Sequence, residues 1–170
     1  MAFYFGADIA LIAVFHVLFG VTWVSIHILA ELILIPDIRK GEKLADLGIL
    51  RHMPKISMVG AIAALATLGT GLLYLFAKFG TDFGVLLSHA EPRTIVIALV
   101  LVLAALTISF GLLRPKALAL GKRAKELKPM DPLPEDFKRH AGLVVKLLRA
   151  QGAMVFATLI LMVLATQGGI

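Results

Sequence analysis

Residues 14–34 read VFHVLFGVTWVSIHILAELIL, an apolar run interrupted by a few polar side chains. At about 100° per residue in an α-helix, two histidines of this run fall within roughly 20° of each other. A small residue, an aromatic residue and a carboxylate share their stripe, which consists of His16, Gly20, Trp23, His27 and Glu31. Ionisable groups in a membrane helix are costly and usually face a protein interior. We therefore expect this stripe to face inward and to bind something.

The composition around this run is that of a membrane protein. The chain has 170 residues, of which 59% are hydrophobic and 16% charged, and its mean hydropathy is +0.94. Soluble domains are about 45–50% apolar, and about 20 helical residues cross a bilayer. The long apolar stretches are 9–36, 56–76, 94–113 and 150–165. The fold class predicted is an all-α integral membrane protein, an antiparallel four-transmembrane-helix bundle forming a single domain of residues 1–170.

The expected helices cover about residues 8–38, 43–78, 92–127 and 134–167. The second of these passes Pro54, where we expect a kink; the alternative is a separate interfacial helix that stops before Pro54. Pro115 is expected to kink the third helix.

The basic residues indicate an orientation. The formal net charge is +6, and most Lys and Arg side chains flank the first and third connections, whereas only Lys78 and Arg93 flank the second. By the positive-inside tendency, the basic loops are cytoplasmic and both termini are outside. The prediction is a multi-pass protein of the cell membrane, in contact with anionic membrane lipid and not with nucleic acid.

The absence of cysteine limits the cofactors. It excludes disulfides, thiolate metal sites, iron–sulfur clusters and covalent haem attachment. A metal must then be held by His, Met, carboxylate or carbonyl groups. The methionines are dispersed rather than clustered as soft Cu(I) coordination prefers, which argues mildly against copper transport.

The two histidines of the first helix suit stacked sites across a bilayer. At a rise of ~1.5 Å per residue, His16 and His27 lie roughly 16 Å apart along the helix. Haem b fits this pattern, as one or two groups, because imidazole is a common axial ligand. Gly20 would leave room for a flat ring, and Trp23 would pack at its edge. The alternative is that both histidines only make interhelical hydrogen bonds.

The expected depth of each histidine in the bilayer indicates which residues could ligate the same iron. His27 and His52 would face each other at one level if the second helix begins near residue 43. For His16 the partner would be an outer-loop histidine, a methionine of the fourth helix, or nothing, and an unfilled position would indicate small-ligand chemistry. The less favoured metal ligands are therefore His89, His140 and Met162. Taken singly, His52, His89 and His140 also read as ordinary interfacial histidines.

Glu31 lies one helical turn beyond His27 on the same face. It would orient His27 from the second shell or relay protons. Equally, it would pair with Lys55 or Arg149 near the interface.

The run His16 to Trp23, in VFHVLFGVTW of residues 14–23, resembles the opening of the haem-binding membrane protoporphyrinogen oxidases and of the copper-resistance protein D type four-helix membrane proteins. Arg51, Ile56 and the run from Gly60 to TGLL at residues 70–73 are similar to their second helix. The resemblance implies that His16 is a haem ligand and Trp23 a packing residue of the site.

Two departures from the oxidase pattern bear on activity. The oxidases typically have a His and a Lys at the start of helix three, where this chain has His89 and Arg93 around a proline. His27 is extra to the pattern, which favours a second ligand and a redox carrier.

The function predicted is a membrane-embedded haem b redox protein, a haem-dependent oxidoreductase if it is an enzyme. It would transfer electrons to or from a quinol or membrane redox partner, or oxidise a porphyrinogen-like substrate. The alternatives are a copper- or metal-handling membrane protein and a structural subunit of a respiratory complex without its own cofactor. A homo-oligomer or a complex subunit fits each of them.

Overall fold

The computed structural model describes residues 2–40, 52–128, 130 and 132–169, and they are overwhelmingly helical. The elements in order are α1 (Ala2–Leu29), the π-helical turn η1 (Ala30–Leu34), α2 (Ile35–Lys40), α3 (Met53–Phe79), α4 (Phe83–Ser88), α5 (Ala90–Ile108), the π-helical turn η3 (Ser109–Leu113), α6 (Arg114–Ala124) and α7 (Glu135–Thr166).

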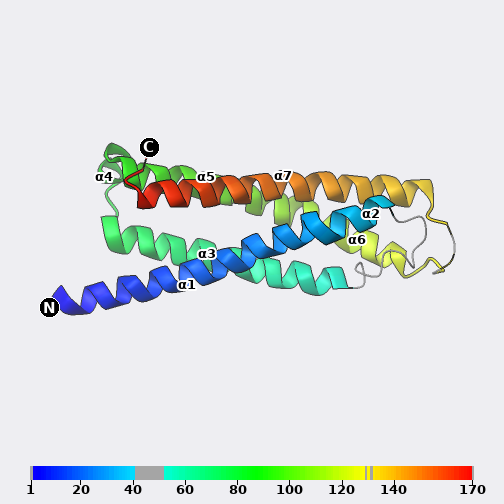
Figure 1. Ribbon diagram of the computed structural model, residues 1–170, viewed down its shortest axis with the longest axis horizontal. Helices are drawn as coiled ribbons and strands as arrows, with labels where there is room; N and C mark the ends of the chain where they lie inside the picture. Colours follow the sequence, from blue (N-terminus) through cyan, green and yellow to red (C-terminus); the bar gives the residue numbers. More distant parts are fainter. Residues whose placement is uncertain (1, 41–51, 129, 131, 170) are drawn as a thin grey trace.

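The fold is an all-α four-helix membrane bundle, as predicted. The 4 helical stretches long and apolar enough to cross a membrane are Asp8–Ile38, Lys55–Phe79, Ala90–Ala124 and Glu135–Thr166. They run side by side along the long axis of the molecule, and the two chain ends lie at the same end of the bundle (Figure 1). We call the opposite end, which carries most of the Lys and Arg side chains, the basic end.

The bundle is built from two helix pairs. α1 packs along α3 and α5 packs along α7, whereas contacts between the two pairs are much sparser. Alanines supply much of the buried surface, including Ala63 and Ala64 on α3 and Ala98 and Ala105 on α5. Small residues allow close approach of helices in a membrane. We call the boundary between the α1/α3 pair and the α5/α7 pair the seam.

The outward faces of the helices carry large apolar side chains. Leu32 is 72% exposed and Ile160 61% exposed, and many other Leu, Val and Ile side chains also point outward. Such a surface would be unstable in water and is stable against lipid acyl chains.

Each π-helical turn ends two residues before a proline. Pro36 follows η1 and Pro115 follows η3, and the backbone N–H of Ile35 and of Arg114 bonds to the carbonyl five residues back, at Ala30 and Ser109. A proline has no N–H and its ring clashes with the carbonyl four residues earlier, so a wider turn relieves the conflict. The helix therefore continues through Pro36, with α2 ending at Lys40, and the membrane-spanning stretch ends at Ile38, as expected. Pro115 is accommodated by η3.

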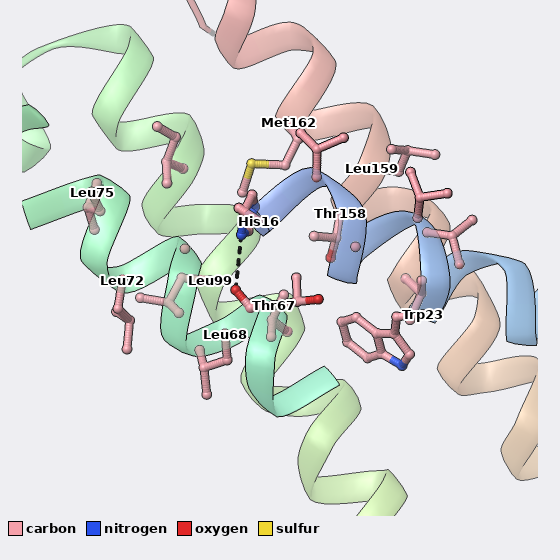
Figure 2. A pocket seen from close by; sticks show the side chains of 18 residues that line it. His16, Trp23, Thr67, Leu68, Leu72, Leu75, Leu99, Thr158, Leu159 and Met162 are labelled. Atoms are coloured by element: carbon pink, nitrogen blue, oxygen red, sulfur yellow. Dashed lines mark hydrogen bonds between the residues drawn. The ribbon is translucent and has the colours of Figure 1, made fainter. Parts of the chain in front are cut away.

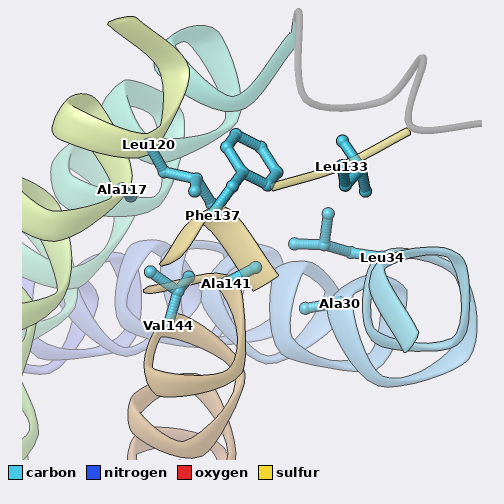
Figure 3. Packing of buried hydrophobic residues seen from close by; sticks show 8 residues of the cluster. All are labelled: Ala30, Leu34, Ala117, Leu120, Leu133, Phe137, Ala141 and Val144. Carbon is cyan, nitrogen blue, oxygen red and sulfur yellow. The ribbon is translucent and has the colours of Figure 1, made fainter. Parts of the chain in front are cut away.

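The basic end is closed by apolar packing. Phe137, at the start of α7, is 1% exposed and packs beside Leu120 of α6 and Leu34 of η1 (Figure 3). An ion pair between Arg123 and Asp136 joins α6 to α7 at the surface. These contacts hold α7 against both α1 and α6.

Several helix ends differ from the sequence expectation. α1 begins at Ala2 rather than near residue 8, since no proline interrupts residues 2–7. α3 begins at Met53 with Pro54 in its first turn, where a missing N–H costs nothing, so Pro54 starts the helix instead of kinking it. The expected helix start near residue 43 lies outside the described residues. α4 forms where a loop was expected, because the Asp82 side chain caps it by accepting from the Gly84 N–H at 2.7 Å.

Candidate functional site

An apolar cavity of about 150 Å³ lies in the seam, bounded by all four long helices. We call it the His16 cavity, and Figure 2 shows the side chains around it. Its lining includes His16, Gly20 and Trp23 of α1, Thr67 and Gly71 of α3, and Met162 of α7. Apart from Thr158, the rest of its wall is aliphatic, so the cavity is suited to an apolar group held by one imidazole.

The imidazole of His16 is held by the backbone of α3. Its Nδ1 lies 3.0 Å from the carbonyl oxygen of Thr67 and 3.3 Å from the hydroxyl of Thr70. A carbonyl only accepts, so Nδ1 carries the proton and donates it, which leaves a lone pair on Nε2. No hydrogen bond reaches Nε2 from the described residues. Histidines that bind metals are held in this way, with the other ring nitrogen donating to a carbonyl or carboxylate.

Gly71 allows the ring of His16 to lie against α3. A Cβ atom at Gly71 would sit 2.9 Å from His16 Cε1 and 3.2 Å from Nδ1, closer than packed side chains tolerate. A Cβ at Gly69, on the same helix, meets nothing within 4 Å. The position of the imidazole thus depends on one glycine.

This contact predicts the outcome of a matched pair of substitutions. Gly71→Ala should force the ring away from the Thr67 carbonyl and destabilise the fold by about 1–3 kcal/mol, the usual cost of overpacking. Gly69→Ala should be neutral or stabilising by up to about 1 kcal/mol, as for other glycines inside a helix. Unfolding in detergent, with ¹⁵N NMR of the His16 ring nitrogens, checks both. Equal effects of the two substitutions would contradict the contact.

Gly20 and Met162 lie around the same cavity. A Cβ at Gly20 would only touch Thr67 Cγ2 at 3.9 Å, so there is room for a larger group beside this glycine in the cavity wall. Met162, on α7, contributes a thioether from the other helix pair. Of the partners predicted for His16, Met162 is therefore the one placed with it in the described chain.

Trp23 separates this cavity from a second one. Its indole is 3% exposed and packs on Ala63 and Ala64 of α3 and on Ala105 of α5, across the seam. It lines both cavities, and its ring lies edge-on to that of His27 with centroids 6.2 Å apart. Trp23 is thus a packing residue between two compartments.

The second cavity, of about 70 Å³, lies toward the basic end and contains polar groups. We call it the Gln151 cavity. His27 and Gln151 line it and are 4% and 3% exposed. The Oε1 atom of Gln151 has no hydrogen-bond partner, and His27 makes no hydrogen bond within the described residues. Ser57 and Ser109 add hydroxyl groups to the wall.

The other predicted histidine ligands lie outside both cavities. His52 is exposed at the start of α3, His89 contacts the Ser88 hydroxyl at 2.9 Å, and His140 donates to the Asp136 carbonyl at 2.8 Å. The predicted His27/His52 pair is not formed, because α3 begins at Met53 and leaves His52 at its exposed end. These positions match ordinary interfacial histidines.

Glu31 lies at the edge of the bundle. Its carboxylate faces Arg149 of α7 at 3.5 Å, an ion pair that was one of the expected alternatives. Both side chains are partly exposed, so the pair contributes little to stability. Glu31 lines neither cavity.

The sequence did not indicate several residues of these cavities. Thr67, Thr70 and Gly71 are common in packed membrane helices and carry no signal by themselves. Gln151 did offer one, as an uncharged polar residue inside the apolar run of the fourth helix.

No group of three or more His, Asp or Glu side chains that could hold a metal occurs within residues 2–40, 52–128, 130 and 132–169. Within the described chain, His16 is the one histidine that lines the His16 cavity, and the Met162 thioether belongs to the same lining. Comparisons of the chain with models of protein families, with characterised proteins and with solved structures found no match.

Proposed function

We propose that this chain is a membrane haem b protein in which His16 ligates the iron, and that it carries electrons between a quinol or another membrane donor and an acceptor. One observation carries the proposal. His16 lines an apolar cavity, the Thr67 carbonyl holds its Nδ1 at 3.0 Å, and no hydrogen bond from the described residues occupies its Nε2. That arrangement fixes the tautomer and raises the basicity of the ligand nitrogen.

The donor chemistry of the cavity fits haem, and the room for a porphyrin would come from opening the seam. A cavity of about 150 Å³ holds a molecule the size of benzene. A porphyrin is larger, so its binding must part the two helix pairs, where contacts are sparse. The free space at Gly20 adds to the room available.

Each residue then has a distinct task. Haem supplies one-electron cycling of iron, with a potential set by axial ligation and burial. His16 would ligate the iron, and the Thr67 carbonyl would orient the His16 ring. Trp23 would keep water that enters from the basic end out of the His16 cavity. Met162 would be the second residue able to hold the iron, which would raise the potential; without that bond, the iron would be open to a porphyrinogen-like substrate.

The proposal includes an orientation in the cell membrane. The Lys and Arg side chains gather at the basic end, which the positive-inside tendency places in the cytoplasm. Both termini would then be outside, and the His16 cavity would lie in the outer half of the bundle.

A titration of purified chain with haemin in lipid nanodiscs tests haem binding. Trp23 is the single tryptophan and lines the cavity, so its fluorescence should be quenched as a Soret band grows, saturating at one haem per chain. Quenching should be much weaker in Gly71→Ala than in Gly69→Ala. A Soret shift without saturable quenching would mean that haem binds elsewhere, against the proposal.

A second candidate function is Cu(I) handling, which one observation favours. His16 and Met162 line the same cavity, and imidazole with thioether is a ligand set that Cu(I) accepts. A single ion also needs no separation of the helices. Anaerobic Cu(I) titration against a chromogenic competitor distinguishes the two candidates: tight copper binding that depends on both residues, without haem binding, would replace the haem proposal.

A further inference from the structure

We infer that the Gln151 cavity is a binding site for water, and that Trp23 is the barrier that keeps this water from the His16 cavity. The bundle would then be hydrated on the basic side of Trp23 and dry on the other. This inference concerns the empty chain as much as the loaded one, so it does not depend on haem.

The unpaired groups of the cavity call for a hydrogen-bonding ligand. Gln151 is 3% exposed, and its Oε1 has no partner, although buried polar atoms are nearly always paired. His27, 4% exposed, also makes no hydrogen bond within the described residues. Gln151 and His27 line the same cavity, and a molecule that both donates and accepts hydrogen bonds would satisfy an amide oxygen and an imidazole there.

The volume of the cavity fits water rather than a larger ligand. Its volume of about 70 Å³ is about half that of the His16 cavity, too small for an aromatic ring but ample for water. A site needs roughly 10–15 Å³ for each water and 2–4 polar partners. Gln151, His27, Ser57 and Ser109 supply them.

The wall of the cavity also provides access. Arg114, which is exposed, and Ser57, which is partly exposed, belong to its lining. Arg114 and the exposed Lys55 lie where α6 and α3 begin, a position typical of the headgroup layer. Water from that layer can enter between α3 and α6. The π-helical turn η3 contributes Ser109 to this wall, and η1 contributes Ala30 and Leu34.

Trp23 closes the inner end. It lines both cavities and fills the seam against Ala63, Ala64 and Ala105. Beyond it, the His16 cavity is almost wholly aliphatic, and an apolar cavity of about this size stays dry. Water would therefore reach His27 but not His16.

Hydroxyl-radical footprinting of the chain in lipid nanodiscs tests this distribution. Radicals produced from water by a brief X-ray pulse oxidise the side chains beside that water, and mass spectrometry locates the products. We expect His27 to be oxidised several times faster than His16, although His27 is the more buried of the two. Equal rates at both histidines, or faster oxidation of His16, would overturn the inference.

Two leucine substitutions provide the matched control. Gln151→Leu keeps the approximate size and removes the acceptor, so oxidation of His27 should fall toward the rate of His16. Gln167→Leu, at an exposed position near the C-terminus, should leave both rates unchanged. If Gln151→Leu has no effect on His27, Gln151 does not hold the water and the assignment is wrong. Because the readout is oxidation rather than spectra, this test can fail while haem binding holds, and the reverse.

Discussion

Replacing His16 with glycine should remove bound haem from the purified protein almost completely. His16 is the sole histidine of its cavity among the described residues, so no other imidazole there can take its place as the ligand. Only the Met162 thioether and apolar contacts would then retain the porphyrin. Adding free imidazole should restore part of the Soret absorbance, because the substitution leaves a hole of the same shape. Haem per chain, measured by pyridine haemochrome, gives the result.

Two other histidines provide controls for this experiment. His89→Gly and His140→Gly change exposed residues that line neither of the two cavities, so haem content should stay at the wild-type level. A loss of haem in either control comparable to that in His16→Gly would show that the ligand lies at an end of the bundle.

Trp23→Ala should be the most destabilising single substitution in the seam. The indole is 3% exposed and bridges α1, α3 and α5 at the middle of the bundle. Truncating a buried tryptophan costs about 3–5 kcal/mol, and the helix pairs have few other contacts to compensate. Reversible unfolding in mixed detergent micelles measures the loss. Trp23→Phe should lower the free energy of unfolding by less than half as much, since phenylalanine retains a six-membered aromatic ring at this position.

A lipid-facing aromatic residue serves as the comparison. Phe156 on α7 is 36% exposed, and Phe156→Ala should change stability by no more than about 0.5 kcal/mol. If both alanine substitutions have similar effects, Trp23 does not hold the pairs together. Trp23→Ala should also join the two cavities and bring the oxidation rate of His16 up toward that of His27.

The fold could be predicted from the sequence because lipid imposes a simple rule. A bilayer requires long apolar helices, and the hydropathy of residues 9–36, 56–76, 94–113 and 150–165 met that rule without tertiary information. The stripe of the first helix was also readable, since helical periodicity alone places His16, Trp23 and His27 on one face. In the structure these three side chains face the seam.

The partners of that stripe could not be predicted, because they depend on the register between helices. His16 rests on Gly71 and the Thr67 carbonyl, and no pattern within α3 marks this height along the helix. The height of His52 depended on where α3 begins, and a proline in the first turn read equally well as a kink. The π-helical turns before Pro36 and Pro115 accommodate these prolines within continuing helices, whereas the sequence predicted a kink at Pro115.

Haem b held by His16 in the seam would be visible in the protein as purified. The most direct test is a reduced-minus-oxidised spectrum of the wild-type protein purified from haem-replete cells, with pyridine haemochrome quantitation and copper analysis. We predict a b-type spectrum with one haem per chain and no stoichiometric copper. A chain purified from such cells without haem would contradict the claim; copper in its place would favour the metal-handling function, and neither would favour a structural subunit.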